Sequence, residues 1–176
     1  MDIDLRKLRP EDAPTVCHWM NDPETVKYLG SGFQKPRSVE EVEEAIRLRL
    51  DGEFTGEELV IADAATGEYL GQINLLLPDE KAGTAEISLV LLPEARRRGI
   101  AFKALQLFLF RAFKEWHYQR LYLKCICANT RALRLYEKAG FRLEGTLRRH
   151  MMTAEGLADV ALYGMLKEEY EQLSLT

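Results

Sequence analysis

The hydrophobic and polar positions of the chain follow two periods, one typical of strands and one typical of helices. Apolar residues at every second position, or in short apolar runs, predict strands. We expect these strands at residues 3–8, 58–63, 69–77, 84–92, 121–128, 141–148 and 160–166. Apolar residues at helical spacing predict helices at residues 10–20, 24–29, 38–50, 99–116 and 129–138.

Start and stop signals support several of these boundaries. Ser38 and Glu41 form the pattern of a capping box, and Asn129 is a good N-cap for the helix that follows it. Gly140 provides the left-handed residue that commonly ends a helix. Pro23 disfavours helix in the residue before it and therefore breaks the first helix at 21–23. Residues 30–37 have no such pattern and are expected to form a loop.

The order of these elements predicts one α/β domain over residues 1–176. Three early helices are followed by three strands separated by turns, which is typical of an antiparallel meander. The remaining strands alternate with helices, so the sheet should be mixed. The 99–116 helix is apolar around most of its circumference, which predicts that it is buried between other layers. A length of 176 residues fits a single domain.

Composition narrows the classes of function. A formal net charge of -4 argues against binding of nucleic acid driven by charge. The sequence has no 18-residue apolar stretch and no signal-peptide pattern, so we expect a cytoplasmic protein that does not cross a membrane. The three cysteines, an odd number, indicate free thiols in a reducing compartment. No histidine has zinc-ligand spacing with a cysteine, and no metal is expected.

The segment 96–101 links a predicted strand to the apolar helix. A helix N-terminus presents unpaired backbone N–H groups and the positive end of the helix dipole, which together attract anions. Gly99 allows close approach of a ligand to the backbone, and Arg96, Arg97 and Arg98 attract phosphate. The alternative is an ordinary solvated basic turn. The glycine and lysine patterns of dinucleotide-binding and Walker loops are absent from the sequence.

The same residues resemble a known family. Residues 96–101 resemble the Arg/Gln-x-x-Gly-x-Gly/Ala motif of the GNAT superfamily of N-acetyltransferases, and residues 129–141 resemble its second motif. Residues 19–24, 141–148 and 162–163 resemble the branch that contains ribosomal-protein N-terminal acetyltransferases of the RimJ/RimL type. That branch also contains spermidine, amino-sugar and antibiotic acetyltransferases.

The resemblance implies a fold and a cofactor site. It implies a mixed, mostly antiparallel sheet with flanking helices, whose two central strands splay apart around acetyl-CoA. The strand before the first motif would bind the thioester and pantetheine through its backbone, residues 97–102 would bind the pyrophosphate, and Asn129 would reach the pantetheine arm. The cofactor-binding residues implied in this way are Leu89, Val90, Leu91, Arg96, Arg97, Arg98, Gly99, Ile100, Ala101, Phe102, Asn129 and Tyr136.

Two catalytic roles follow for an enzyme that acetylates a primary amine. Tyr136 is the predicted general acid that protonates the leaving thiolate; without the resemblance, a core aromatic would be the simpler interpretation. Glu86 shares a strand face with Ser88 and Val90 and is the first candidate for a general base or for binding a cationic substrate. An exposed edge glutamate is the alternative. Some family members place a glutamate where this chain has Lys124, so that base cannot be assumed.

The acceptor amine is expected to bind between the early helices and the last hairpin. Candidate acceptor-binding residues are Trp19, Asn21, Asp22, Tyr28, Glu86, Glu144 and Tyr163. The first hypothesis is acetylation of a protein N-terminal amine, which rests on the branch resemblance. The alternatives are a small-molecule amine (a polyamine, an amino sugar or an aminoglycoside), a non-catalytic module that binds CoA, and, least favoured, a nucleic-acid binder. The family also suggests a possible homodimer.

Overall fold

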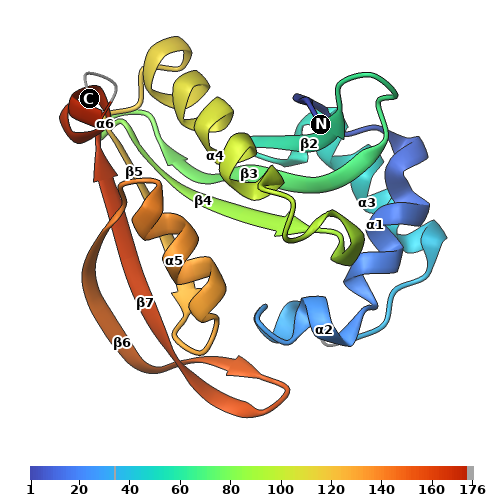
Figure 1. The fold of residues 1–176 in the computed structure, drawn as a ribbon. Coiled ribbons are helices and arrows are strands. Elements are labelled where there is room, and N and C mark those ends of the chain that lie inside the picture. The colour runs from blue at the N-terminus through green and yellow to red at the C-terminus, as the bar shows by residue number, and fades with distance from the viewer. Residues whose placement is uncertain (34, 174–176) are drawn as a thin grey trace.

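The protein, seen in a computed structural model that describes residues 1–33 and 35–173, contains one seven-stranded sheet (Figure 1). The strand order across the sheet is β1-β2-β3-β4-β5-β7-β6. The strands are β1 Ile3–Lys7, β2 Glu57–Asp63, β3 Tyr69–Asp79, β4 Thr84–Leu91, β5 Arg120–Ile126, β6 Arg142–Thr153 and β7 Gly156–Leu166. All neighbours in this part of the chain are antiparallel except β4 and β5, which are parallel.

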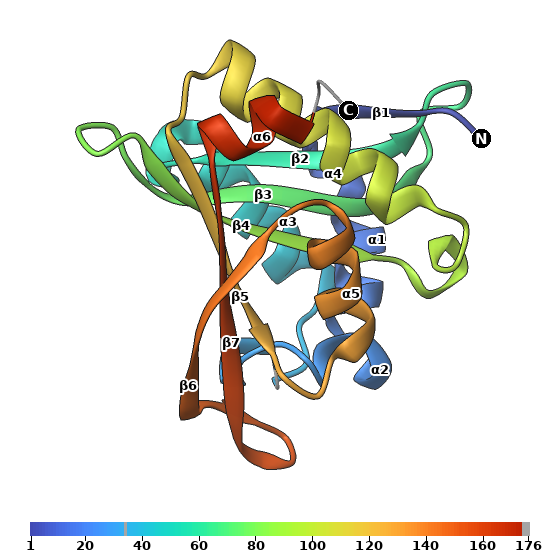
Figure 2. The same cartoon turned by 60° about the vertical axis from the view of Figure 1, so that its left-hand side comes forward.

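The parallel pairing of β4 with β5 covers only a few residues, and the sheet separates into two parts beyond it. Residues Thr84, Ala85 and Glu86 of β4 pair with Arg120, Leu121 and Tyr122 of β5. Beyond these three pairs the two strands diverge, although β4 continues to Leu91 and β5 to Ile126. Figure 2 shows the result: β1 to β4 form one wing, and β5, β7 and β6 form a second wing at a steep angle to it. The splayed central strands and the mixed, mostly antiparallel sheet agree with the expected fold class.

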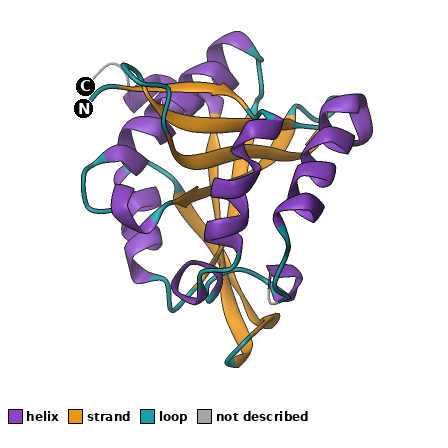
Figure 3. Cartoon of the chain, turned by 90° about the vertical axis from the view of Figure 1, so that its right-hand side faces the viewer, coloured by secondary structure: helices purple, strands orange, loops and turns teal. Residues whose placement is uncertain are grey.

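Six α-helices in the described residues flank the sheet: α1 Ala13–Met20, α2 Pro23–Val26, α3 Val39–Leu48, α4 Ile100–Phe110, α5 Thr130–Lys138 and α6 Lys167–Leu173. The helix α4 covers one face of the first wing, while α1 and α3 pack together on the opposite face (Figures 1 and 3). The helix α5 lies beside the second wing, next to the fork (Figure 2). No helix in residues 1–33 and 35–173 is both long and apolar enough to cross a membrane.

The core extends over both faces of the sheet, with α4 on one face and with α1 and α3 on the other. Ala104, Leu105 and Phe108 of α4 are fully buried, and full burial of a side chain as large as phenylalanine contributes about 1.5–3 kcal/mol. The expectation that this helix is buried on all sides is wrong. Leu107 and Phe110 are 42% and 51% exposed, because the helix packs on one face of the sheet and no layer covers its outer side in the described part of the chain.

Most predicted elements are confirmed, and the differences are at their ends. The capping box is present, with the backbone N–H of Glu41 donating to Ser38 Oγ and that of Ser38 donating to Glu41 Oε2. The second helix ends at Val26, the last hairpin extends beyond both predicted strands, and α6 was not expected. The 30–37 loop includes a short 3-10 turn at Ser31–Phe33, and Gln34 lies outside the described residues.

Candidate active site

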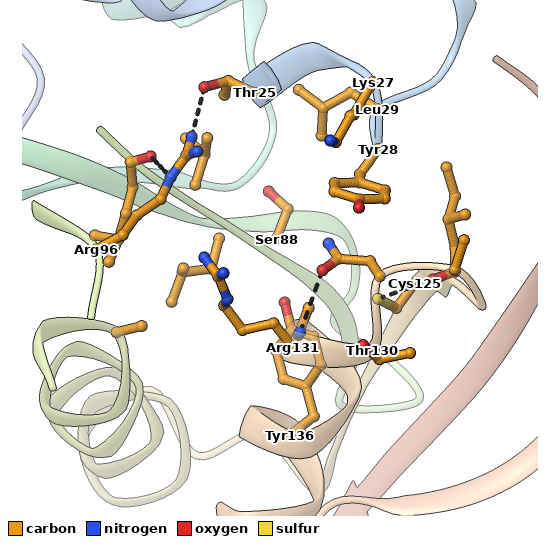
Figure 4. Close-up of a pocket in the computed structure, with 18 of the residues that line it drawn as sticks. Thr25, Lys27, Tyr28, Leu29, Ser88, Arg96, Cys125, Thr130, Arg131 and Tyr136 are labelled. Carbon is orange, nitrogen blue, oxygen red and sulfur yellow. Dashed lines mark hydrogen bonds between the residues drawn. The ribbon is translucent and has the colours of Figure 1, made fainter. Parts of the chain in front are cut away.

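A cavity of about 660 Å³ lies where the two wings separate (Figure 4). Its walls come from the divergent ends of β4 and β5, the start of α5, and α2 with the residues that follow it. The residues that line it are Glu24, Thr25, Lys27, Tyr28, Leu29, Ile87, Ser88, Leu89, Val90, Leu91, Arg96, Ala101, Lys124, Cys125, Ile126, Ala128, Asn129, Thr130, Arg131, Ala132, Arg134 and Tyr136. The cavity thus contains residues from both motifs that the sequence singled out.

The unpaired length of β4 forms one wall. Its residues Ile87–Leu91 pair with β3 on one side, but within the described residues they have no strand partner on the β5 side. Backbone N–H and C=O groups at an open strand edge need partners, because leaving them unsatisfied costs free energy. Leu89, Val90 and Leu91 therefore offer main-chain hydrogen bonds to an extended ligand, as expected for a pantetheine arm.

The turn before α4 fits an anionic group. Gly99 is the N-cap of α4 with φ 75°, and among the described residues no side chain caps this helix. A Cβ atom at Gly99 would meet no atom within 4 Å, so the space over its backbone is open. Arg97 also has a left-handed φ of 62°, a strained conformation for a non-glycine residue that is often found at functional sites. Uncapped N–H groups beside open space suit a diphosphate.

The remaining residues of this turn differ in exposure. Arg97 and Arg98 are exposed, and Ala101 lines the cavity. Ile100 is buried in the core. Phe102 is half-buried, and Lys138 Nζ lies 4.4 Å from the centroid of its ring. The side chain of Ile100 faces away from any ligand, so only its backbone N–H is available for binding.

The second motif contributes Asn129 and Tyr136. Asn129 Oδ1 accepts a hydrogen bond of 3.3 Å from the backbone N–H of Ala132, which confirms the N-cap. Tyr136 is 7% exposed, and its ring packs edge-on against Phe141. Within the described residues its hydroxyl has no hydrogen-bond partner. In the same residues, every fully buried side-chain nitrogen or oxygen atom has a hydrogen-bond partner, so the Tyr136 hydroxyl is not fully buried. The Tyr136 hydroxyl must therefore open onto the cavity.

Burial strongly raises the pKa of Tyr136, and the nearby Cys125 raises it further. The phenol therefore keeps its proton throughout the neutral range. Cys125 also lines the cavity, and burial raises the pKa of its thiol to about 12. A thiol with so high a pKa is a poor nucleophile. Both groups therefore keep their protons at neutral pH, and Tyr136 is the one that the family resemblance implies as the proton donor.

A chain of side-chain hydrogen bonds, not expected from the sequence, ends at the cavity in Ser88. Trp19 Nε1 donates to the Tyr69 hydroxyl at 3.1 Å, and Tyr69 donates to Gln72 Oε1 at 3.0 Å. Gln72 Nε2 then donates to Asn74 Oδ1 at 3.0 Å, and Asn74 Nδ2 donates to Ser88 Oγ at 3.3 Å. Because the indole N–H can only donate, the direction of every bond is fixed.

The Ser88 hydroxyl consequently accepts from Asn74 and keeps its own hydrogen for the cavity. Gln72 and Asn74 were visible as two amides at strand spacing within an apolar strand. The two ends of the chain, Trp19 on α1 and Ser88 on β4, come from elements that the sequence alone does not bring together.

Among the acceptor-binding candidates, the structure brings only Tyr28 to the cavity wall. Trp19 is 6% exposed, with its indole N–H bonded to Tyr69. The side-chain amide of Asn21 bonds to the backbone of Arg37 on both sides. Asp22 accepts from the Thr25 hydroxyl. These three side chains are engaged in holding α1 and α2, so the structure does not support acceptor binding by them.

The three remaining acceptor-binding candidates do not line the cavity, and each of them bonds to another side chain. Glu144 forms a bidentate ion pair with Arg120, and the Tyr163 hydroxyl donates to Glu137 Oε1 at 2.7 Å. Glu86 does not itself line the cavity. Its Oε2 lies 2.9 Å from the Nζ atom of Lys124, which does line it. Lys124 therefore stands between the Glu86 carboxylate and the cavity.

Comparisons with known proteins identify the family to which the chain belongs. Residues 2–142 match the family described as acetyltransferase (GNAT) domain. The uncharacterized N-acetyltransferase p20 of Bacillus licheniformis is 28% identical over 96% of this chain and 94% of its own length. The spermidine N(1)-acetyltransferase of Escherichia coli is 26% identical over 82% of this chain and 75% of its own length.

A solved structure has the same fold. The crystal structure of spermidine N-acetyltransferase from Vibrio cholerae in complex with CoA and spermine superposes with a TM-score of 0.86 at 24% identity, covering 96% of this chain and 98% of that one. These relatives do not single out the RimJ/RimL branch. With a family match over residues 2–142, the chain belongs to the GNAT acetyltransferase family and is an N-acetyltransferase that uses acetyl-CoA as its acyl donor.

Proposed function

We propose that this enzyme acetylates a small-molecule primary amine, with polyamines such as spermidine as the first class of acceptor. The support is the similarity to spermidine acetyltransferases over most of the chain. A protein N-terminal amine, favoured by the sequence motifs alone, is the competing acceptor. The observation that supports acetyl transfer itself is the cavity in the fork, which brings the open edge of β4 and the Tyr136 hydroxyl together.

Each wall of the cavity has a separate task in this proposal. Acetyl-CoA supplies an activated acetyl thioester. The uncapped turn at Gly99 binds the diphosphate, and the backbone of Leu89–Leu91 orients the pantetheine arm. Asn129 keeps its amide N–H groups for the same arm while its oxygen caps α5. Such orientation lowers the entropic cost of bringing the two reactants together.

Tyr136 acts as the general acid. Attack by the amine forms the new N–C bond and breaks the C–S bond, and the departing sulfur takes a proton from the Tyr136 hydroxyl. The raised pKa of Tyr136 keeps that proton available at neutral pH. The surplus proton of the amine leaves to solvent or to a carboxylate, and the Tyr136 phenolate regains a proton from solvent, which restores the acid for the next cycle. A positioned acid of this kind typically contributes about 10²- to 10⁴-fold in rate.

Glu86 remains the proposed carboxylate on the acceptor side. One of its oxygens is paired with Lys124, so a cationic amine must compete with that lysine or reach Glu86 through a water molecule. Glu24 on α2 is the carboxylate that directly lines the cavity, and it is paired with Lys27 at 2.6 Å. Both acidic groups are thus balanced by a lysine in the structure.

The test is an acceptor screen with purified protein and acetyl-CoA. Thiol release is followed with spermidine, spermine, an amino sugar, an aminoglycoside and short peptides, and the products are identified by mass spectrometry. The proposal predicts acetylated polyamine as the main product when all acceptors compete. Preferential acetylation of peptide N-termini would instead establish the competing function, and CoA binding without turnover on any acceptor would indicate a binding module.

A further inference from the structure

The side chain of Arg96 lies at one side of the cavity and joins two parts of the fold that are distant in sequence (Figure 4). Its Nε atom donates to the backbone oxygen of Leu91, at the end of β4, at 3.1 Å. Its Nη2 atom donates to Thr25 Oγ1, on α2, at 2.5 Å. One guanidinium group therefore ties the end of β4 to α2. Two of its five N–H donors are used in this way, and three remain for other partners.

The partner of Arg96 on α2 is Thr25, whose hydroxyl hydrogen is already in use. Thr25 is 6% exposed, and its hydroxyl donates its single hydrogen to Asp22 Oδ2 at 2.5 Å. The same oxygen can then meet Arg96 only as an acceptor. The three side chains form one directed chain from Arg96 through Thr25 to Asp22, with a positive group at one end and a negative group at the other. Hydrogen bonds to charged groups are stronger than neutral ones.

The helix held by this chain contributes the acceptor side of the cavity. The residues Lys27, Tyr28 and Leu29 follow α2 directly and line the cavity, and Figure 4 shows them along its upper wall. The helix α2 has four residues, too few to be stable without tertiary contacts. The Thr25–Arg96 hydrogen bond is therefore important for the position of Tyr28.

The other end of the chain belongs to the turn that would bind the diphosphate. Arg96 directly follows the 3-10 turn Pro93–Ala95 and directly precedes Arg97, whose φ is left-handed. A ligand bound to the backbone N–H groups after Arg97 restricts the main chain of this turn. Restricting the main chain of Arg96 also restricts where its guanidinium can lie.

We propose that Arg96 is a positioning residue that couples the two halves of the site: when acetyl-CoA binds the turn, Arg96 fixes α2 through Thr25, and with it Tyr28 at the acceptor side. This proposal rests on acetyl-CoA binding in the cavity, as set out above, but not on the identity of the amine. The coupling is reciprocal, so an acceptor that orders α2 also tightens acetyl-CoA binding.

Amide hydrogen exchange, measured by mass spectrometry on the full chain with and without CoA, tests the proposal. Thr25→Val removes the hydroxyl from a buried site with little change of shape, and Thr25→Ser is the matched control that keeps it. In the parent and in Thr25→Ser, CoA should slow exchange both at the start of α4 and in residues 23–29. In Thr25→Val, CoA should slow exchange at α4 but leave residues 23–29 unchanged.

Kinetics provide a second readout. Loss of one hydrogen bond to a charged group weakens binding by about tenfold. The KM for the amine should therefore rise about tenfold in Thr25→Val. The dissociation constant of CoA alone should stay within about twofold of the parent. Arg96→Lys, which keeps the charge but cannot span both partners, should also lose the CoA-dependent protection of residues 23–29. This second variant provides the test if Thr25→Val does not fold.

Three outcomes would overturn the coupling. Equal protection of residues 23–29 by CoA in the parent and in Thr25→Val would show that α2 is ordered without Arg96. Protection at α4 alone in the parent would show that α2 does not respond to the cofactor. Protection at neither place would remove the cofactor assignment itself, and the coupling with it.

Discussion

Lys124 and Glu86 meet across the fork of the sheet, with Nζ and Oε2 2.9 Å apart. Glu86 is the last residue of β4 that pairs with β5, and Lys124 is on β5 just beyond the paired region. The lysine lines the cavity, whereas the glutamate lies behind it. This arrangement limits how strongly the site attracts cations, because the carboxylate nearest to the fork is already neutralised.

Replacing Lys124 should therefore improve binding of cationic acceptors. In Lys124→Met the Glu86 carboxylate loses its partner and becomes available to an ammonium group. The gain expected from one partly exposed charge is roughly fivefold or less in KM for spermidine. Steady-state kinetics with spermidine and with a singly charged amine measure it, and the polyamine should benefit more.

The double variant Lys124→Met/Glu86→Gln is the control for this prediction. It should lose the gain, because no carboxylate is then exposed, and the double-mutant cycle isolates the pairwise term. A gain that persists in the double variant would mean that removing bulk, rather than exposing Glu86, is responsible.

Replacing Tyr136 by phenylalanine should lower kcat by about 100-fold or more, because the leaving thiolate loses its proton donor. The dissociation constant of acetyl-CoA should change little, since the ring and its packing on Phe141 are kept. Titration calorimetry beside steady-state kinetics separates the two effects. A variant with parental kcat would remove Tyr136 from the chemistry, and one that fails to bind acetyl-CoA would assign it a purely structural role.

Replacing Gly99 should weaken the binding of acetyl-CoA as well as lower the stability of the fold. Gly99→Val forces a branched side chain into a left-handed backbone and into the open space over the turn, and the dissociation constant of acetyl-CoA should rise about tenfold or more. Gly67→Val is a matched control, because Gly67 has nearly the same φ, 74°, and equally open space. It lies in the turn between β2 and β3.

Both glycine variants should lose stability, at about 1–2 kcal/mol or more for a side chain in the left-handed region. Calorimetric titration with acetyl-CoA distinguishes them, since Gly67→Val should bind like the parent. Equal loss of affinity in the two variants would assign the effect to general destabilisation and would argue against the phosphate turn.

Three buried tyrosines make stability fall at alkaline pH. Burial raises the pKa values of Tyr69, Tyr136 and Tyr163 above their ordinary value of 10.0. Above that pH the unfolded chain releases these protons while the folded chain keeps them, so the unfolded state is favoured. Their contribution is fully present below pH 10.0 and is lost above it, at up to about 1.4 kcal/mol per pH unit for each tyrosine.

Urea denaturation at a series of pH values from neutral to alkaline measures this slope. Tyr136→Phe should have a shallower slope than the parent above pH 10.0, the ordinary tyrosine value, because one of the three buried phenol protons is gone. An unchanged slope would show that the Tyr136 phenol does not remain protonated in the folded state.

The sequence predicted the cofactor half of the site far better than the acceptor half. The turn at Gly99 and the cap at Asn129 are local features, in which a glycine, an N-cap and a helix start lie within a few residues of one another. The sequence does not show that the predicted acceptor-binding side chains have partners. In the fold, Trp19 bonds to Tyr69 and Asn21 bonds to the backbone of Arg37. Asp22 bonds to Thr25.

These pairings depend on how helices pack against strands, which periodicity does not specify. The same reason explains Glu86, which the sequence predicts to face the substrate. The sequence shows only that Lys124 replaces the glutamate base of some family members, and it does not show that Lys124 pairs with Glu86. A homodimer stays a prediction.

The most direct test of the central claim is a crystal structure of the protein grown with CoA and spermidine. We predict the diphosphate within hydrogen-bond distance of the backbone nitrogens at the start of α4, and the cofactor sulfur next to the Tyr136 hydroxyl in the fork between β4 and β5. CoA bound elsewhere, with its sulfur remote from Tyr136, would contradict the account.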